Sequence, residues 1–406
     1  MSRMIQVGSF RWMKTLNKST ILNMIRLHGP ISRAEIAKMT KLTPPTVTNI
    51  VGELLESNLV IEAELGESTG GRKPIMLKIN ADAFTVIGIY AGAKRIRGVA
   101  ANLEGEVQHT VHVEIPPEPT EEAFVDLVQG AIRQLLDRAD LQTRPCLGIG
   151  VGMHGLVDTE KGVSIFAPNL NIRDLPLKDR LEQAFQLPVE VENDVRALAL
   201  GESWFGLGKD IADFICVHVG TGIGAGIILN NELYRGPSFT AGEIGHTTID
   251  LNGPKCGCGN VGCLEALAAG PAILYRVREA IRQGRSTVLA EWVNGETERL
   301  TGEMVHLAAQ QGDELAIEVL ADAGRYLGIG LANLINTLNP SRIILSGGVA
   351  RAGHFVLEPL QQTVKERALS AAAKDVAIMC SRLGDNGAAI GAMTLVLQDL
   401  FMPSYA

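Results

Sequence analysis

Residues 242–265, GEIGHTTIDLNGPKCGCGNVGCLE, hold one histidine and three of the six cysteines of the chain. The four side chains are His246, Cys256, Cys258 and Cys263. Tetrahedral zinc takes thiolate and imidazole ligands, and a Cys3His set fills all four positions, leaving none for a reactive water. The spacing therefore predicts a structural Zn²⁺; the alternative is three free thiols and an unrelated histidine.

Glycines and carboxylates surround these four residues. Three glycines separate the thiols: Gly257, Gly259 and Gly262. A chain that wraps a metal needs unusual backbone angles there, which glycine adopts readily. Glu243 precedes the cysteines and Glu265 follows the last one. We expect the metal to rigidify a loop that presents Glu243, His246 and Glu265 to a ligand.

The length and composition of the chain favour a globular protein of two or three domains. It has 406 residues, of which 46% are hydrophobic and only 4% aromatic, so its cores should be aliphatic. No apolar run reaches the roughly 18 residues of a membrane span. The N-terminal text lacks the apolar core of a signal peptide, and clustered cysteines without such a signal favour metal binding in a reducing compartment. We therefore expect a cytoplasmic protein without a membrane segment.

Charge is unevenly distributed along the chain. The first 80 residues contain eleven Lys/Arg and six Asp/Glu, a net +5, whereas the whole chain carries −8 and the remainder therefore −13. A basic head on an acidic body predicts that only the head meets a polyanion.

The head reads as three helices. Apolar spacing predicts the first over residues 17–27. Ser32 begins a second helix, with Glu35 completing a capping box. Thr43 is a good N-cap for the third, Pro44 occupies its first position, and the helix should run to about residue 57.

A β-hairpin should follow the helices, with strands at 59–64 and 75–77 joined by the glycine-rich text GESTGGRKP. Three helices and such a wing form a winged helix-turn-helix, which binds DNA; a small protein-interaction module is the alternative. The predicted DNA-binding residues are Ser32, Arg33, Pro44, Pro45, Thr46, Thr48 and Asn49 on the helices, with Arg72 and Lys73 on the wing.

The body reads as two similar α/β lobes with a cleft between them. The first has strands at 84–91, 95–102, 107–115 and 146–151, with a helix at 120–137. The pattern partly recurs as strands at 214–219, 224–229 and 342–345. Glycine-rich turns at 220–226 and 346–348 either cradle phosphates or simply turn the chain.

A set of polar residues fits a polyhydroxylated ligand, since hydroxyls donate to carboxylates and accept from amide or imidazole N–H groups. Asn193 and Asp194 join a strand at 187–191 to a helix at 195–205. Asp194 is either the helix N-cap or a base that accepts a proton from a sugar hydroxyl. Asn169 lies on a loop expected to line the cleft, and Glu243, His246 and Glu265 complete the set.

These motifs resemble the ROK family (repressors, open reading frames and kinases). The resemblance rests on the His/Cys cluster, GIGVGMHGLVD at 148–158, ENDV at 192–195 and the GTGIGAG turn. It extends over nearly the whole chain, residues 14–78 and 81–398. The presence of both parts resembles the repressor branch, which includes xylose and N-acetylglucosamine repressors. The helical text ISRAEIAKMTKLTPPTVTNIV followed by the STGGRKP wing is most similar to the xylose-repressor type.

The resemblance implies an actin-like, hexokinase-type body, and a homodimer or tetramer on a palindromic operator. It implies domains at 1–80, 81–200 (with a C-terminal helix at about 385–400) and 201–384. A sugar of the xylose, glucose or N-acetylglucosamine class would bind in the interlobe cleft, and His246 would use one ring nitrogen for zinc and the other for the sugar. The implied sugar contacts are Gly155, Asn169, Asn193, Asp194, Glu243, His246 and Glu265.

Two positions depart from the family pattern. Family kinases begin the first lobe with an Asp-x-Gly-x-Thr phosphate turn, but this chain has Tyr90 in place of the aspartate. Tyrosine supplies no carboxylate to a hard cation. The proline before Gly155 is replaced by His154. The sequence thus predicts a sugar-responsive repressor of carbohydrate-utilisation genes with no catalytic residue, Asp194 being a vestigial base. The alternatives are an ATP-dependent sugar kinase with a regulatory head, and a module that docks a phosphotransfer protein.

Overall fold

The computed structural model describes residues 10–65, 73–138, 141–369, 371 and 375–402. Its contacts divide the chain into two units, Met1–Asp194 with Ala388–Ala406, and Val195–Gly387. The first unit contains the head, a five-stranded lobe and the C-terminal helix, and the second contains the other five-stranded lobe. Among the described residues, no helix is both long and apolar enough to cross a membrane.

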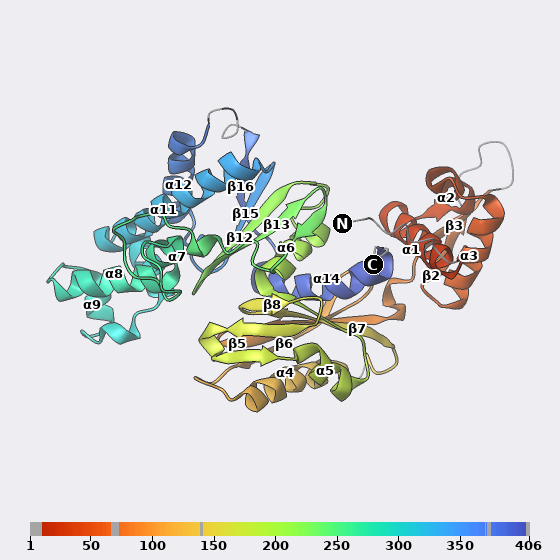
Figure 1. Ribbon diagram of the computed structural model, residues 1–406, viewed down its shortest axis with the longest axis horizontal. Coiled ribbons are helices and arrows are strands. Elements are labelled where there is room, and N and C mark those ends of the chain that lie inside the picture. Colours follow the sequence, from red (N-terminus) through yellow and green to blue (C-terminus); the bar gives the residue numbers. More distant parts are fainter. Residues whose placement is uncertain (1–9, 66–72, 139–140, 370, 372–374, 403–406) are drawn as a thin grey trace. The chain divides into compact units, whose positions relative to one another are not determined.

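The head is a winged helix-turn-helix, as predicted (Figure 1). Its elements are α1 (Phe10–His28), β1 (Ile31–Ser32), α2 (Arg33–Thr40), α3 (Pro44–Glu56), β2 (Val60–Leu65) and β3 (Ile75–Ile79). Both predicted caps are present: Ser32 and Glu35 form the capping box of α2, and the Thr43 side chain accepts the Thr46 N–H at the start of α3. Apolar residues of α3 then pack inward because they repeat at helical spacing.

Two details of the head differ from the sequence-based expectation. The first helix begins at Phe10, seven residues before the predicted start. In addition, the hairpin gains a third strand, because Ile31 and Ser32 pair with Leu77 and Met76 and give the order β1-β3-β2. A two-residue strand is too short to leave a period-two pattern in the sequence.

The first lobe is a mixed sheet covered on both faces. Its elements are β4 (Thr85–Ala91), β5 (Arg95–Ala101), β6 (Val107–Glu114), α4 (Glu121–Leu136), β7 (Cys146–Met153), β8 (Leu156–Asp158), β9 (Val163–Ala167), β10 (Ile172–Leu175), α5 (Leu177–Phe185), β11 (Val189–Asn193) and α14 (Gly387–Phe401). The main sheet runs β11-β7-β4-β5-β6, with α4 on one face and α14 on the other (Figure 1). Gly88 and Gly150 permit the close approach of α14, since a Cβ at either would collide with its backbone.

The second lobe repeats this plan. Its elements are α6 (Asp194–Phe205), β12 (Phe214–Val219), β13 (Ile223–Leu229), β14 (Glu232–Tyr234), α7 (Leu264–Ala268), α8 (Gly270–Arg282), α9 (Val288–Trp292), α10 (Gly302–Gln310), α11 (Glu314–Leu338), β15 (Arg342–Ser346), α12 (His354–Arg367) and β16 (Ala377–Cys380). The sheet order is β14-β13-β12-β15-β16.

Both sheets therefore combine an antiparallel meander with two parallel strands. In the first lobe β4, β5 and β6 are antiparallel neighbours, while β7 and β11 continue the sheet from β4 in parallel. In the second, β12, β13 and β14 form the meander, while β15 and β16 continue from β12. Each lobe encloses its own aliphatic core. The expected pair of similar α/β lobes is confirmed.

Candidate functional site

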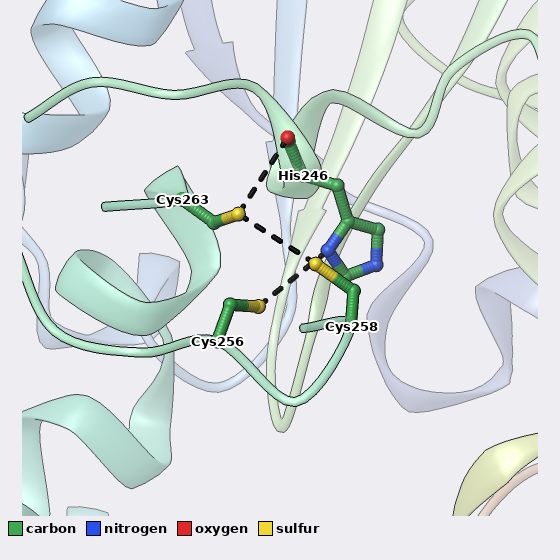
Figure 2. Close-up of side chains that lie close together, drawn as sticks. All are labelled: His246, Cys256, Cys258 and Cys263. Carbon is green, nitrogen blue, oxygen red and sulfur yellow. Dashed lines mark hydrogen bonds between the residues drawn. The ribbon is translucent and has the colours of Figure 1, made fainter. Parts of the chain in front are cut away.

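The histidine and three cysteines come together in the second lobe. Their ligand atoms all lie within 4.8 Å of one another. The Cys256 Sγ–His246 Nδ1 and Cys258 Sγ–Cys263 Sγ distances are both 3.7 Å. A tetrahedron with Zn–S bonds of about 2.3 Å has edges of about 3.7 Å, so these separations suit zinc. Figure 2 shows the Nδ1 of His246 turned toward the sulfurs and the other ring nitrogen turned away.

The surroundings of the thiols also fit a cation. Burial raises the pKa of Cys263 to about 12 and raises that of Cys256. A hydrogen bond from the Asn260 backbone N–H lowers the pKa of the exposed Cys258 instead. Without a metal, the two buried sulfurs, Cys256 and Cys263, are therefore neutral thiols. A bound divalent ion would stabilise all three cysteines as thiolates.

Two of the three glycines behave as predicted. Gly259 and Gly262 have φ of +98° and +69°, in the region that favours glycine. The prediction was wrong for Gly257, which is absent from the positive-φ residues of the described chain and would have open space around a Cβ. Gly259 closes a turn by donating its N–H to Cys256 O at 3.0 Å, and Gly262 follows the antiparallel bridge between Lys255 and Val261.

Glu265 connects the cysteine cluster to a glycine-rich turn. Its Oε2 accepts the Ile223 N–H at 3.1 Å, and its Oε1 lies 4.0 Å from Cys256 Sγ. A side chain at Gly222 would meet the same carboxylate. Glu243 is exposed and lies immediately before the short 3₁₀ helix Ile244–His246. The loop thus contributes His246 to the cluster, holds Glu265 beside the cluster and places Glu243 just before His246.

The remaining predicted sugar contacts form a second group in the first lobe. Asn193 Nδ2 donates to Gly155 O at 2.9 Å and to Asp194 Oδ1 at 3.1 Å. Asp194 is only 8% exposed, and α6 begins at this residue. Gly155 has φ +91°, and a Cβ there would lie 2.9 Å from Ala167 Cα, so only glycine fits. This group belongs to one unit of the chain, and Glu243, His246 and Glu265 to the other.

His154 connects Asp194 to Asn169, a role that sequence reasoning missed. Its Nε2 lies 2.9 Å from Asn169 Nδ2, and its Nδ1 lies 3.8 Å from Asp194 Oδ2. Because the amide group is a donor, Nε2 accepts and the proton sits on Nδ1, toward the carboxylate. The available signal was the histidine that replaces the family's proline immediately before Gly155.

The family resemblance aligns Tyr90 with a carboxylate of the family's kinases. Burial raises the pKa of its phenol well above the usual range, and the nearby charge of Asp194 raises it further. A side chain at Gly92 would meet the Tyr90 ring, with Cε1 at 2.7 Å, so the ring fills the space over this turn. The turn therefore presents a neutral hydroxyl and offers no anionic ligand to a hard cation.

The residues predicted to bind DNA differ in exposure. Pro44, Pro45, Thr48 and Asn49 are exposed at the start of α3, as a recognition helix requires. Thr46 is half-buried, and Lys73 is exposed just before β3, whereas Arg72 lies outside the described residues.

Two other head residues have partners within the head. Arg33 pairs with Glu62 at 3.1 Å. Ser32 is 5% exposed, and its hydroxyl is bonded to Glu35. We therefore assign Ser32 a capping role rather than a base contact.

The fold and site define a class of protein: a winged helix-turn-helix joined to a two-lobed, actin-like body with a Cys3His cluster. Residues 86–399 match the ROK family, and residues 16–61 match the winged helix-turn-helix DNA-binding family. The chain belongs to the ROK family.

Named relatives include both regulators and kinases. The chain is 34% identical to the xylose repressor of Caldicellulosiruptor bescii over 98% of this chain and 100% of that protein. A solved ROK family transcriptional regulator, described as a homologue of the E. coli MLC protein, is 30% identical with a TM-score of 0.85 and covers 96% of this chain and 97% of its own. A ROK family glucokinase from Streptomyces griseus, solved with glucose and AMPPNP, is 33% identical with a TM-score of 0.69 and covers 77% and 98%.

Proposed function

We propose that this protein is a transcriptional repressor whose affinity for operator DNA is set by a sugar. The observation that carries the proposal is one chain that joins a winged helix-turn-helix to a sugar-kinase-like body in which half-buried Tyr90 replaces the kinase carboxylate. Such a body keeps groups for binding a sugar but lacks the means to place a magnesium–phosphate group. Ligand binding would then serve regulation rather than catalysis.

The head would read DNA through the exposed start of α3. Asn49 and Thr48 are short polar side chains that reach base edges, and Lys73 supplies a phosphate contact. A homodimer would place two such heads on the half-sites of a palindrome, about 34–36 Å apart. The positive charge of residues 1–80 supports this assignment.

The effector would be a neutral sugar. Asp194 and Asn193, with Asn169 and the Gly155 backbone, offer acceptors and amide donors in the first lobe. Glu243, Glu265 and the second ring nitrogen of His246 offer the same chemistry in the second. Sugar hydroxyls need this mixture, because each one both donates and accepts. The polar set favours xylose, glucose or N-acetylglucosamine over an apolar effector.

His246, Cys256, Cys258 and Cys263 would hold a structural Zn²⁺. The ion fixes the loop that carries His246 and Glu265, because four protein ligands close its coordination shell. With Nδ1 of His246 on the metal side, Nε2 is left to bind a hydroxyl, so a single ring would couple metal and sugar.

One other function is supported by a specific observation. Asp194 and the glycine-rich turn at 220–226 are both retained, as in an ATP-dependent sugar kinase. The neutral, half-buried Tyr90 opposes that activity, since a base without a placed phosphate contributes little. Consumption of ATP in the presence of an aldose would establish the kinase.

Replacing Asp194 tests the proposed site. We expect Asp194→Ala to abolish the effect of the sugar on DNA affinity while the affinity without sugar stays unchanged. Asp126→Ala, an exposed aspartate on α4, is the matched control and should behave as wild type. Loss of DNA binding itself in Asp194→Ala would contradict the assigned role. An unchanged DNA complex with every sugar, together with capture of a phosphotransfer protein, would favour the docking function.

A further inference from the structure

A pocket in the first unit borders the group around Asp194. It has a volume of about 540 Å³ and is walled by the segment before α4 and by the β9–β10 turn. This volume lies within the range of about 300–1,000 Å³ typical of small-ligand sites. The polar residues that line it are Glu118, Thr120, Glu121, Asn169, Asn171 and Arg173.

The walls of the pocket are held in place by local structure. The Arg173 guanidinium lies 3.9 Å from the Phe166 ring centroid, so its plane is fixed by stacking. Leu170 and Ile172 are buried beneath the turn and anchor it. On the other wall, Thr120 caps α4, and Glu121 lies 3.7 Å from Arg180. The hydrogen-bond donors and acceptors that line the pocket thus belong to segments that packing and capping hold in place.

Asn169 belongs both to this pocket and to the proposed sugar site. Its side-chain nitrogen lies 2.9 Å from His154, whose other ring nitrogen faces Asp194 at 3.8 Å. Asn169 therefore stands where a ligand bound at Asp194 would continue into the pocket.

We propose that this pocket is a second subsite, which binds the additional unit of a neutral disaccharide or glycoside. This inference rests on the proposed function, because it names the class of effector for the same site. The amide, carboxylate and guanidinium groups match the alternating hydroxyls of a second sugar ring.

The charges of the lining favour a neutral carbohydrate over a sugar phosphate. Among the lining residues, Glu118 and Glu121 outnumber Arg173, and Arg180 beside Glu121 offsets only part of that negative charge. An anion placed there would meet two carboxylates, and like charges at short range repel. A neutral polyol avoids this repulsion and still uses all three charged groups as hydrogen-bond partners.

Calorimetric titration of the full-length protein tests the subsite. The probes are xylose with xylobiose, glucose with cellobiose, and glucose 6-phosphate. We expect one disaccharide to bind at least about tenfold more tightly than its monosaccharide, as hydrogen bonds to charged groups allow. Glucose 6-phosphate should bind no better than glucose.

Two variants test whether the preference for the disaccharide arises in this pocket. Arg173→Ala and Glu118→Gly should each remove most of the preference for the disaccharide while leaving monosaccharide binding unchanged. Glycine suits position 118 because its φ is +50°, so that variant introduces no strain. Arg299→Ala, which removes an exposed arginine of the second lobe, is the matched control.

The outcomes separate this inference from the proposed function. Equal affinities for disaccharide and monosaccharide, with release of DNA by the monosaccharide, would overturn the second subsite and leave the repressor intact. Equal weakening of both ligands by Arg173→Ala would also overturn it. Absence of binding by every sugar would contradict the proposed function itself.

Discussion

At the scale of single residues, two positions depart from the kinase pattern that the family resemblance gives. Tyr90 places a neutral phenol where the family's kinases have a carboxylate, and His154 places an imidazole against Asp194. Asp194 raises the pKa of Tyr90 through its charge and lies 3.8 Å from His154 Nδ1. We propose that these surroundings suit Asp194 to binding a ligand rather than to activating one.

The pKa of Tyr90 leads to a prediction at alkaline pH. Because the folded pKa is raised above the unfolded value of about 10, the native state retains this proton longer than the unfolded state does. Its stabilising contribution is complete below pH 10 and is lost as the pH rises further. Urea unfolding should therefore show wild type losing stability more steeply than Tyr90→Phe above that pH. Parallel curves for the two proteins would contradict the assigned burial.

His154 should position Asn169 for the effector. We expect His154→Pro, which restores the family residue, to weaken sugar binding by about tenfold because Asn169 loses its hydrogen-bond partner. His154→Gln keeps a donor and an acceptor and should recover part of the affinity. His112→Gln, at an exposed position on β6, serves as the control. Calorimetry measures all four proteins, and wild-type affinity in His154→Pro would rule out the role.

At the scale of elements, α14 depends on glycines in the sheet it covers. A Cβ at Gly88 would come within 2.7 Å of Met393 N and closer still to Ala389 O. Gly88→Ala should lower the unfolding free energy by about 1–3 kcal/mol through overpacking. Gly130→Ala, in α4 with open space around it, should instead stabilise by about 0.5–1 kcal/mol. Shifts of the urea midpoint measure both, and equal shifts would contradict this account of the packing.

The sequence predicted most elements because their signals are local. Helix α3 has an N-cap, a proline at its first position and apolar residues at helical spacing, and the structure begins and ends it within a residue of the prediction. Strand β1 could not be predicted, because two residues have no periodicity and their pairing depends on β3. The early start of α1 could not be predicted either, because the sequence there has no clear N-cap residue.

The candidate site was predictable only as a set of residues. The Cys3His spacing identified the cluster, which the structure assembles within 4.8 Å. The chain from Asp194 through His154 to Asn169 could not be predicted, because it joins residues on three segments whose contacts depend on the tertiary fold. The pocket beside Asn169 could not be predicted either, because its two walls lie about 50 residues apart in the sequence.

At the scale of the whole molecule, the metal should be required for regulation but not for DNA binding. Cys258→Ser should lose zinc and the response to sugar, because the loop carrying His246 and Glu265 is no longer fixed. The head has its own core and should still bind DNA. Elemental analysis measures the metal, and Cys380→Ser, an exposed cysteine outside the cluster, is the control. A full zinc content in Cys258→Ser would contradict the ligand set.

The central claim is that sugar binding to the body changes the affinity of the same chain for DNA. To change occupancy strongly, the sugar must favour one state of the protein by several kcal/mol, about 5.5 for a shift from 1:99 to 99:1. Fluorescence anisotropy of a labelled palindromic operator, titrated with protein with and without a panel of sugars, measures this coupling directly. We predict tight binding that one sugar of the panel relieves. No binding of DNA at low salt, or steady ATP consumption with that sugar, would contradict the account.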